Sequence, residues 1–291
     1  MHRFLLHNEE IRDTGERVVS PGQVGLVNGW GVFSTIRVQD GVLFCWDRHW
    51  ARMQRDAARM RVPFPSDAKW LEARLYRLID ANHAANSTLR VIVVRNRGGM
   101  WEGPAAAERA FDTVAFTAPL NSWGEAVKLG IVPQARHAAS EFAGTKYLSW
   151  SENLTRYERA HEQGFDEVVL LNERGEVAEC TSANIFVVQG EGVFTPPLSA
   201  GCLPGVTRAL LLEEICVPGL AVSEKTLLPA DLESADEVFI TSTTRDLMPV
   251  ASVDGLRIRQ GRRVRDRLQQ AFSAYTTAYV ASRVREAEKA S

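Results

Sequence analysis

The sequence predicts a two-domain α+β protein. Strand-like and helix-like segments alternate through both halves of the chain, without an internal repeat. The stretch Pro119–Gly124 lies between the halves and has no strong periodicity. The chain has 291 residues, 45% of them hydrophobic, which is enough for two domains of ordinary size. We predict a smaller N-terminal α+β domain over residues 1–118, an interdomain connection over 119–126 and a larger C-terminal domain over 127–291.

The elements expected in the first half follow from periodicity and from turn residues. Asp47 is expected to cap the first of the helices. The predicted elements are a strand over 41–44, helices over 47–61 and 67–81, and strands over 89–95 and 113–117.

The second half alternates in the same way. Gly164 is expected to end the first of its helices. The predicted elements are a strand over 127–132, a helix over 152–163, short strands up to 184–189, a helix over 205–216 and a final helix near 264–284.

Composition excludes several classes of function. A net charge of -2 and a pI near 6.3 give no reason to expect nucleic acid or an acidic membrane as a partner. The four cysteines are scattered and none forms a C-x-x-C pair, so we expect neither a disulfide framework nor a metal site. The longest apolar runs are of strand length and no export signal is evident. We therefore expect a cytoplasmic protein with no membrane partner.

Lys146 is the most informative residue, because only five lysines stand among the 34 basic residues. Lys69, Lys128, Lys225 and Lys289 lie in segments typical of a solvated surface. Lys146 lies within Gly144–Trp150, where a polar stretch turns apolar and an amine can project from a strand end into a cleft. Taken alone, Lys146 would be interpreted as one more surface charge. The residues downstream of it favour an amine that forms an imine.

Two features downstream of Lys146 complete what a phosphorylated pyridine aldehyde requires. Glu179 follows a strand-like Val177 and precedes small polar residues, so its carboxylate can be held beside a ring nitrogen; Glu176 competes for this role. The start of the helix near 205 offers the backbone amides of Val206 and Thr207, which no intrahelical carbonyl can use, to a phosphate. The order is lysine, glutamate and helix start.

These segments, with several others in the same order, resemble the fold type IV (class IV) aminotransferases that use pyridoxal 5'-phosphate (PLP). That family contains branched-chain aminotransferases, D-amino acid aminotransferases and 4-amino-4-deoxychorismate lyases. The resemblance extends roughly from Asn28 to Gly261. Its parts are residues 29–33, 49–53, Lys146, 164–167, 179–186, 203–208, 241–244 and 248–250.

The resemblance implies a D-amino acid aminotransferase-like fold with PLP at the domain interface. Lys146 resembles the catalytic Schiff-base lysine, and Glu179 the partner of the pyridine nitrogen. Arg52 resembles the arginine that binds the cofactor phosphate, and Leu203 the aliphatic residue on one face of the ring. Val206, Thr207 and Thr243 resemble further phosphate contacts, and Phe33, Arg90 and Thr244 are the candidate substrate-binding residues. A homodimer is implied as well.

The resemblance leaves the reaction open, because transamination and carbon–carbon cleavage share every cofactor contact. Where the family usually has an acidic residue between two glycines and a glutamate after the phenylalanine, this chain has Trp30 and Ser34, which is closer to the lyase. Arg90 occupies the position of a carboxylate-binding arginine in branched-chain aminotransferases. We expect an aminotransferase that moves an amino group between an amino acid, of apolar or branched-chain type, and a 2-oxo acid such as 2-oxoglutarate. The alternatives are a 4-amino-4-deoxychorismate lyase that releases pyruvate and 4-aminobenzoate, and a non-catalytic PLP-binding protein.

Overall fold

The computed structural model describes residues 1–20, 22–99 and 108–290, and its contacts divide the chain into two compact units. The first unit comprises Met1–Asn121, Thr145–Trp150 and Tyr279–Ser291, and the second comprises Ser122–Gly144 and Ser151–Ala278. The chain first passes from one unit to the other between Asn121 and Ser122, within the predicted connection over 119–126. Thr145–Trp150, which we had expected in the C-terminal domain, groups with the first unit because its backbone binds a strand of that unit, as shown below.

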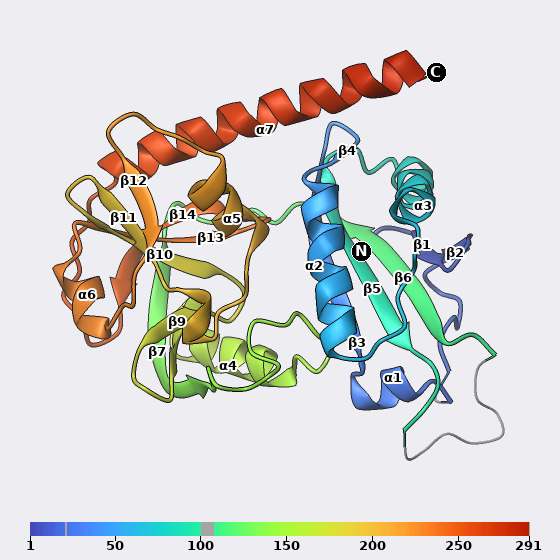
Figure 1. The fold of residues 1–291 in the computed structure, drawn as a ribbon, viewed down its shortest axis with the longest axis horizontal. Helices are drawn as coiled ribbons and strands as arrows, with labels where there is room; N and C mark the ends of the chain where they lie inside the picture. The colour runs from blue at the N-terminus through green and yellow to red at the C-terminus, as the bar shows by residue number, and fades with distance from the viewer. Residues whose placement is uncertain (21, 100–107, 291) are drawn as a thin grey trace. The chain divides into compact units, whose positions relative to one another are not determined.

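The described residues of the first unit form a six-stranded sheet in the order β2-β1-β6-β5-β3-β4, and all neighbouring strands in it are antiparallel (Figure 1). The strands are β1 (Phe4–His7), β2 (Glu10–Asp13), β3 (Gly31–Gln39), β4 (Val42–Leu43), β5 (Ser87–Arg95) and β6 (Phe111–Ala118). The helices are α1 (Val24–Asn28), α2 (Trp46–Arg59) and α3 (Ala68–Ala81).

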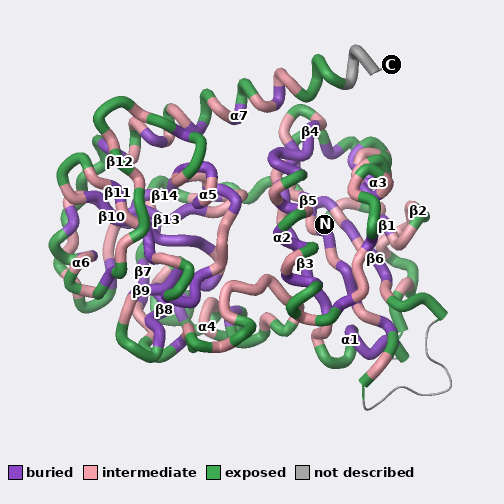
Figure 2. The backbone as a smooth tube through the Cα atoms, viewed as in Figure 1, coloured by how far each residue is buried: buried purple, intermediate pink, exposed green. Residues whose placement is uncertain are grey.

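One face of this sheet packs against α2 and α3. Successive side chains of a strand alternate between the two faces, so Val32 and Ile36 of β3 enter a core to which α3 contributes Leu71, Leu75 and Leu78. Phe33 and Thr35 of β3, and Arg90 of β5, therefore lie on the opposite face. The central strands of the sheet are mostly buried, whereas the edge strand β2 is partly exposed (Figure 2).

The structure confirms most of the predicted elements of this unit and corrects one detail. Asp47 does not cap α2: the helix begins at Trp46, and the residue before it, Cys45, is its N-cap in a left-handed conformation. Asp47 lies in the first turn, where its negative charge is still favourable near the helix N-terminus. We did not predict β1, β2, β3 or α1. In β3, Phe33 and Ser34 are both buried although they are neighbours on opposite faces, which breaks the apolar–polar pattern near its start.

The second unit is built on an eight-stranded mixed sheet in its described residues, in the order β12-β11-β10-β13-β14-β7-β8-β9. Its strands are β7 (Val127–Arg136), β8 (Glu167–Asn172), β9 (Val177–Cys180), β10 (Asn184–Gln189), β11 (Gly192–Thr195), β12 (Ala221–Glu224), β13 (Glu237–Ser242) and β14 (Asp246–Val253). Its helical segments are α4 (Ser151–Glu162), the short 3-10 helix η1 (Leu198–Ala200), α5 (Val206–Glu213), α6 (Pro229–Ser234) and the start of α7 (Arg263–Ala290).

The two faces of this sheet carry different side chains. Ile185 and Ile240 enter the main core on one face. Phe186 of β10 and Phe239 of β13 are paired in register and stack on the other, with ring centroids 5.0 Å apart. Asn184 and Thr241 form the next pair on that second face, and α5 packs against β13. The predicted strand over 184–189 is confirmed in full, whereas β7 and α7 extend further than predicted.

A buried ion pair holds the turn that follows β9. Glu167 is fully buried, and its carboxylate accepts hydrogen bonds from the backbone N–H and hydroxyl of Thr181 and from the Ser182 hydroxyl at 2.6 Å. Arg245 lies 3.7 Å from the carboxylate and also donates to the Ser182 hydroxyl. The pair therefore joins the turn after β9 to the turn between β13 and β14.

In the described part of the chain, no helix combines the length and the apolar character needed to cross a membrane.

We predict that Glu167→Gln lowers the free energy of unfolding by about 3 kcal/mol, because it leaves the buried Arg245 guanidinium without its carboxylate. Urea unfolding followed by circular dichroism measures this loss. Glu162→Gln, the same change at an exposed position of α4, is the control and is expected to alter stability by less than about 0.5 kcal/mol. Equal stability of the two variants would contradict the role of the pair.

Candidate active site

The segment that carries Lys146 is attached to β3 through its backbone. The N–H of Phe33 donates to the Lys146 carbonyl at 3.2 Å, and the N–H of Leu148 donates to the Gly31 carbonyl at 2.9 Å. Val32 and Tyr147 form an isolated antiparallel bridge between these two bonds. Lys146 is therefore fixed beside β3 although more than a hundred residues separate them in the sequence.

The amine of Lys146 lies against aromatic rings. Its Nζ is 4.6 Å from the ring centroid of Phe33 and 5.8 Å from that of Trp150. The two rings pack edge to face, with centroids 6.0 Å apart. An ammonium over an aromatic face is attracted by the ring quadrupole, so these rings define where the amine lies.

Asp56 fixes the backbone of Lys146 from the other side, and the sequence analysis missed it. Its side chain is buried, and Oδ2 accepts the Lys146 N–H at 3.0 Å while Oδ1 accepts from Arg55. The signal that could have found it is the spacing of His49, Arg52 and Asp56, which places three polar side chains on one face of α2.

Arg52 is buried on that face, with 8% of its surface exposed. Its Nη2 donates to the hydroxyl of Ser34 at 2.8 Å, and that hydroxyl is 2.7 Å from Nδ1 of His49. Burial lowers the pKa of Arg52 to about 10, although Asp56 opposes the shift, so the guanidinium is still charged at neutral pH. Burial, followed by the charges of Arg52 and Lys146, lowers the pKa of His49 well below its usual value.

Arg90 shares the Phe33 ring with Lys146. Its guanidinium carbon is 3.9 Å from the ring centroid, and burial lowers its pKa. It lies on the face of the sheet that α2 and α3 leave uncovered. The structure thus brings the predicted residues Lys146, Phe33 and Arg90 together, around one aromatic ring.

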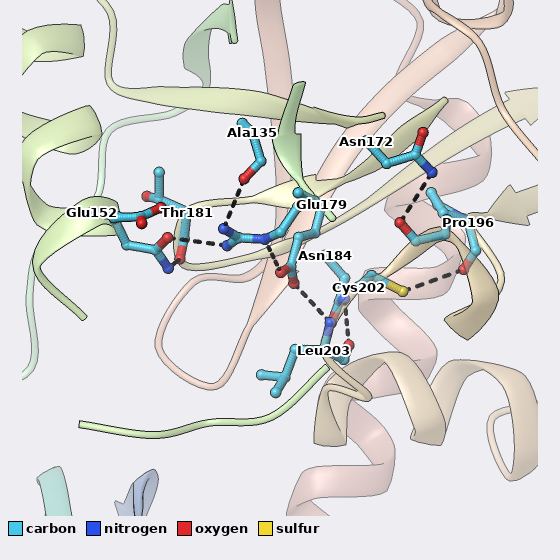
Figure 3. Close-up of polar contacts among 12 residues, drawn as sticks. Ala135, Glu152, Asn172, Glu179, Thr181, Asn184, Pro196, Cys202 and Leu203 are labelled. Carbon is cyan, nitrogen blue, oxygen red and sulfur yellow. Dashed lines mark hydrogen bonds and ion pairs between the residues drawn. The ribbon is translucent and has the colours of Figure 1, made fainter. Parts of the chain in front are cut away.

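In the second unit, Glu179 is buried in β9 and its two oxygens have different partners. Nε of Arg136 donates to Oε1 at 3.0 Å, and the backbone N–H of Leu203 donates to Oε2 at 2.9 Å (Figure 3). A carboxylate has about four lone-pair positions, so it can accept a further N–H. The competing Glu176 is instead bound by Arg174 and Asn172.

Asn184 holds the segment that leads into α5, and it lies beside Leu203 (Figure 3). The Asn184 amide donates to the Leu203 carbonyl at 2.8 Å. A β-carbon at position 205 would lie only 2.1 Å from Oδ1 of Asn184, so glycine is required there. Gly205 is the N-cap of α5 and has no side chain that could bind the first-turn amides. The amides of Val206 and Thr207 therefore remain available to an anion.

Two predicted contacts lie on the turn between β13 and β14. Thr243 and Thr244 are both half-buried there, and the Thr244 carbonyl accepts the indole N–H of Trp123 at 2.9 Å. The same turn is fixed by Arg245, through its contact with Glu167. Besides Asp56, the positioning residues that sequence reasoning missed are Arg136 and Asn184.

The side chains fit the chemistry of PLP. In the first unit, Lys146 has the primary amine that an aldehyde requires. In the second unit, the Glu179 carboxylate has a lone-pair position for the N–H of a pyridinium. In the first unit, the buried Arg52 guanidinium suits a phosphate group. In the second unit, the amides that begin α5 suit one as well.

Comparisons with known proteins agree with this chemistry. A family model described as amino-transferase class IV matches residues 31–253. D-alanine aminotransferase from Bacillus licheniformis is 29% identical over 88% of this chain and 90% of its own. Branched-chain-amino-acid aminotransferase from Escherichia coli is 30% identical over 84% of this chain and 83% of its own.

Solved structures show the same fold. The structure of the branched-chain aminotransferase from Escherichia coli gives a TM-score of 0.84 at 26% identity, covering 94% of this chain and 93% of its own. A structure described as a 4-amino-4-deoxychorismate lyase, from Legionella pneumophila, gives a TM-score of 0.82 at 23% identity, covering 90% of this chain and 96% of its own, which indicates a shared fold alone. The chain belongs to the class IV aminotransferase family, whose members are enzymes that use pyridoxal 5'-phosphate.

Proposed function

We propose that this enzyme moves an amino group between an amino acid with an apolar or branched side chain and a 2-oxo acid such as 2-oxoglutarate. The observation that carries the proposal is the arrangement around Phe33. Lys146 Nζ lies 4.6 Å and the Arg90 guanidinium 3.9 Å from the same ring centroid. A substrate amino acid with an apolar side chain requires three features: a positive group that binds its carboxylate, an amine that moves its α-proton and an apolar surface that contacts its side chain.

Lys146 is the proposed catalytic residue. When bound, PLP supplies a pyridine ring that withdraws electrons from the substrate α-carbon. The Lys146 amine would hold the cofactor through its aldehyde carbon, and the same amine would be the group that moves a proton at the substrate α-carbon. The contacts from Asp56 and Phe33 fix the backbone of Lys146, from which this amine extends.

Other residues are proposed to hold the cofactor. Arg52 binds the phosphate from the first unit. In the second unit, the Val206 and Thr207 amides and the Thr243 hydroxyl also bind it, Glu179 pairs with the ring nitrogen and Leu203 packs on the ring. A carboxylate at the nitrogen favours the protonated pyridinium, and a guanidinium can pair with two phosphate oxygens at once.

Arg90 is the proposed carboxylate-binding residue, with Phe33 beside the substrate side chain and Thr244 as a further contact. Among the described residues, no carboxylate or carbonyl pairs with the Arg90 guanidinium, which is half-buried on a partly apolar sheet face. A half-buried cation without an ionic partner favours an anionic ligand, because the ligand replaces the solvation that burial has removed.

The two departures from the usual family pattern do not oppose this proposal. Ser34 lies under α2, bonded to Arg52 and His49. The indole N–H of Trp30 donates to the Met60 carbonyl at 2.7 Å, and Arg95 covers its ring. Both side chains make these contacts within the first unit, and neither contact favours the lyase.

The relatives support an amino acid as the donor and leave its stereochemistry to experiment, because one of them acts on D-alanine and the other on branched-chain amino acids. A homodimer and a cytoplasmic location stay predictions from the resemblance and the composition.

The first test is to add single L- and D-amino acids to the purified yellow enzyme without an acceptor. We expect the absorbance of the lysine-bound cofactor to convert to that of the pyridoxamine form with L-leucine, L-isoleucine or L-valine, and 2-oxoglutarate to restore it. Conversion by D-alanine alone would overturn the substrate class. No conversion by any amino acid would overturn transamination, and release of pyruvate from aminodeoxychorismate would then identify the lyase.

Lys146→Ala is expected to abolish turnover in any of these reactions, because no other group replaces the amine. Borohydride reduction of the wild-type enzyme, followed by peptide mass analysis, should find the cofactor on Lys146. Lys69→Ala, which removes an exposed lysine of α3, is the control and should leave both turnover and labelling intact. Retained turnover in the Lys146 variant would overturn the proposal.

Arg90→Gln is expected to lower kcat/KM for the amino acid by about tenfold to a hundredfold, because a hydrogen bond to a charged group contributes about 1.5–3 kcal/mol. The loss should appear in KM more than in kcat. Arg77→Gln on the exposed face of α3 is the matched control. An unchanged kcat/KM in the Arg90 variant would show that the substrate carboxylate binds elsewhere.

A further inference from the structure

We propose that Ser34 and His49 are positioning residues that hold the Arg52 guanidinium in the orientation that binds the cofactor phosphate. This inference rests on the phosphate role of Arg52 in the proposed function. Ser34 and His49 come from β3 and α2 of the first unit, and each is almost completely buried.

The geometry is a continuous chain of three polar groups. Nη2 of Arg52 donates to the Ser34 hydroxyl at 2.8 Å, and the hydroxyl oxygen lies 2.7 Å from Nδ1 of His49. Nη2 and Nδ1 are themselves 3.5 Å apart. The serine oxygen therefore lies between a guanidinium and an imidazole and contacts both.

The direction of these hydrogen bonds follows from charge. A guanidinium only donates, so it takes one lone pair of the serine oxygen. His49 is neutral because burial and the nearby Arg52 and Lys146 lower its pKa, and a cation beside Nδ1 favours the tautomer with its lone pair there. The Ser34 hydroxyl then donates to Nδ1, and the order is Arg52 to Ser34 to His49.

This chain restricts Arg52 because the guanidinium is planar and rigid. A hydrogen bond that fixes one terminal nitrogen limits rotation of the whole group, so less conformational entropy is lost when a phosphate binds. The serine oxygen is also polarised, since it donates to His49 while it accepts from Arg52. Loss of the hydroxyl should therefore weaken phosphate binding without removing the charge.

The experiment compares two ligands that differ only in the phosphate. PLP and pyridoxal are titrated separately into the full-length protein after its cofactor has been removed, and binding is followed by absorbance. We expect Ser34→Ala to weaken PLP binding about tenfold, as for one hydrogen bond to a charged group, and to leave pyridoxal binding unchanged. Ser34→Thr retains the hydroxyl and should restore the affinity for PLP.

His49 provides a second pair of variants. The amide oxygen of asparagine lies at the same number of bonds from the backbone as Nδ1, so His49→Asn keeps an acceptor for Ser34, whereas His49→Leu removes it. We expect the asparagine variant to bind PLP more tightly than the leucine variant, with no difference for pyridoxal. The ³¹P resonance of bound PLP should shift in Ser34→Ala and return in Ser34→Thr.

Arg52→Gln separates failure of this inference from failure of the proposed function. If Arg52→Gln weakens PLP selectively and Ser34→Ala does not, the positioning role is overturned and the phosphate role of Arg52 stands. If Arg52→Gln weakens PLP and pyridoxal equally, both are overturned. Equal weakening of the two ligands in Ser34→Ala would show that the hydroxyl supports the fold alone, which also overturns the inference.

Discussion

The burial of three polar side chains on one face of α2 is the constraint on which the first unit depends. A buried polar or charged group is destabilising unless it is hydrogen-bonded, so His49, Arg52 and Asp56 each require partners from other segments. Ser34 of β3 serves the first two, and the backbone of Lys146 serves Asp56. Because these partners lie far apart in the sequence, the hydrogen bonds that satisfy the polar side chains of α2 also place Lys146 beside the sheet.

In the second unit, the backbone of Leu203 connects two buried polar side chains. The N–H of Leu203 donates to Glu179 and its carbonyl accepts from Asn184. The carboxylate proposed for the ring nitrogen is therefore bonded to Leu203, and Leu203 lies three positions before Val206, where the helix proposed for the phosphate begins. A displacement of Leu203 would therefore disturb both groups together.

The sequence predicted the periodic elements and the residues with distinctive chemistry. Helix α3 and strand β10 followed from their patterns, and Lys146 stood out because lysine is rare in this chain. β3 was missed because a buried phenylalanine and a buried serine stand next to each other near its start, so its apolar and polar residues do not separate cleanly onto two faces. Asp56, Arg136 and Asn184 were missed for a different reason: each acts through a backbone or side-chain group far away in the sequence. Such partners are created by the tertiary fold, and a local pattern does not contain them.

Alternation along β3 also decides which differences within a motif can affect the substrate. Ser34 follows Phe33 directly, yet the two side chains lie on opposite faces of the sheet, and a serine under α2 cannot contact a ligand that binds over Phe33. A substitution at position 34 therefore acts on Arg52 and, in our proposal, on the phosphate that Arg52 binds, whereas substitutions at positions 33, 35 and 90 act on the other face. Substrate preference should be sought in that second group, because it shares the face on which the Lys146 amine lies.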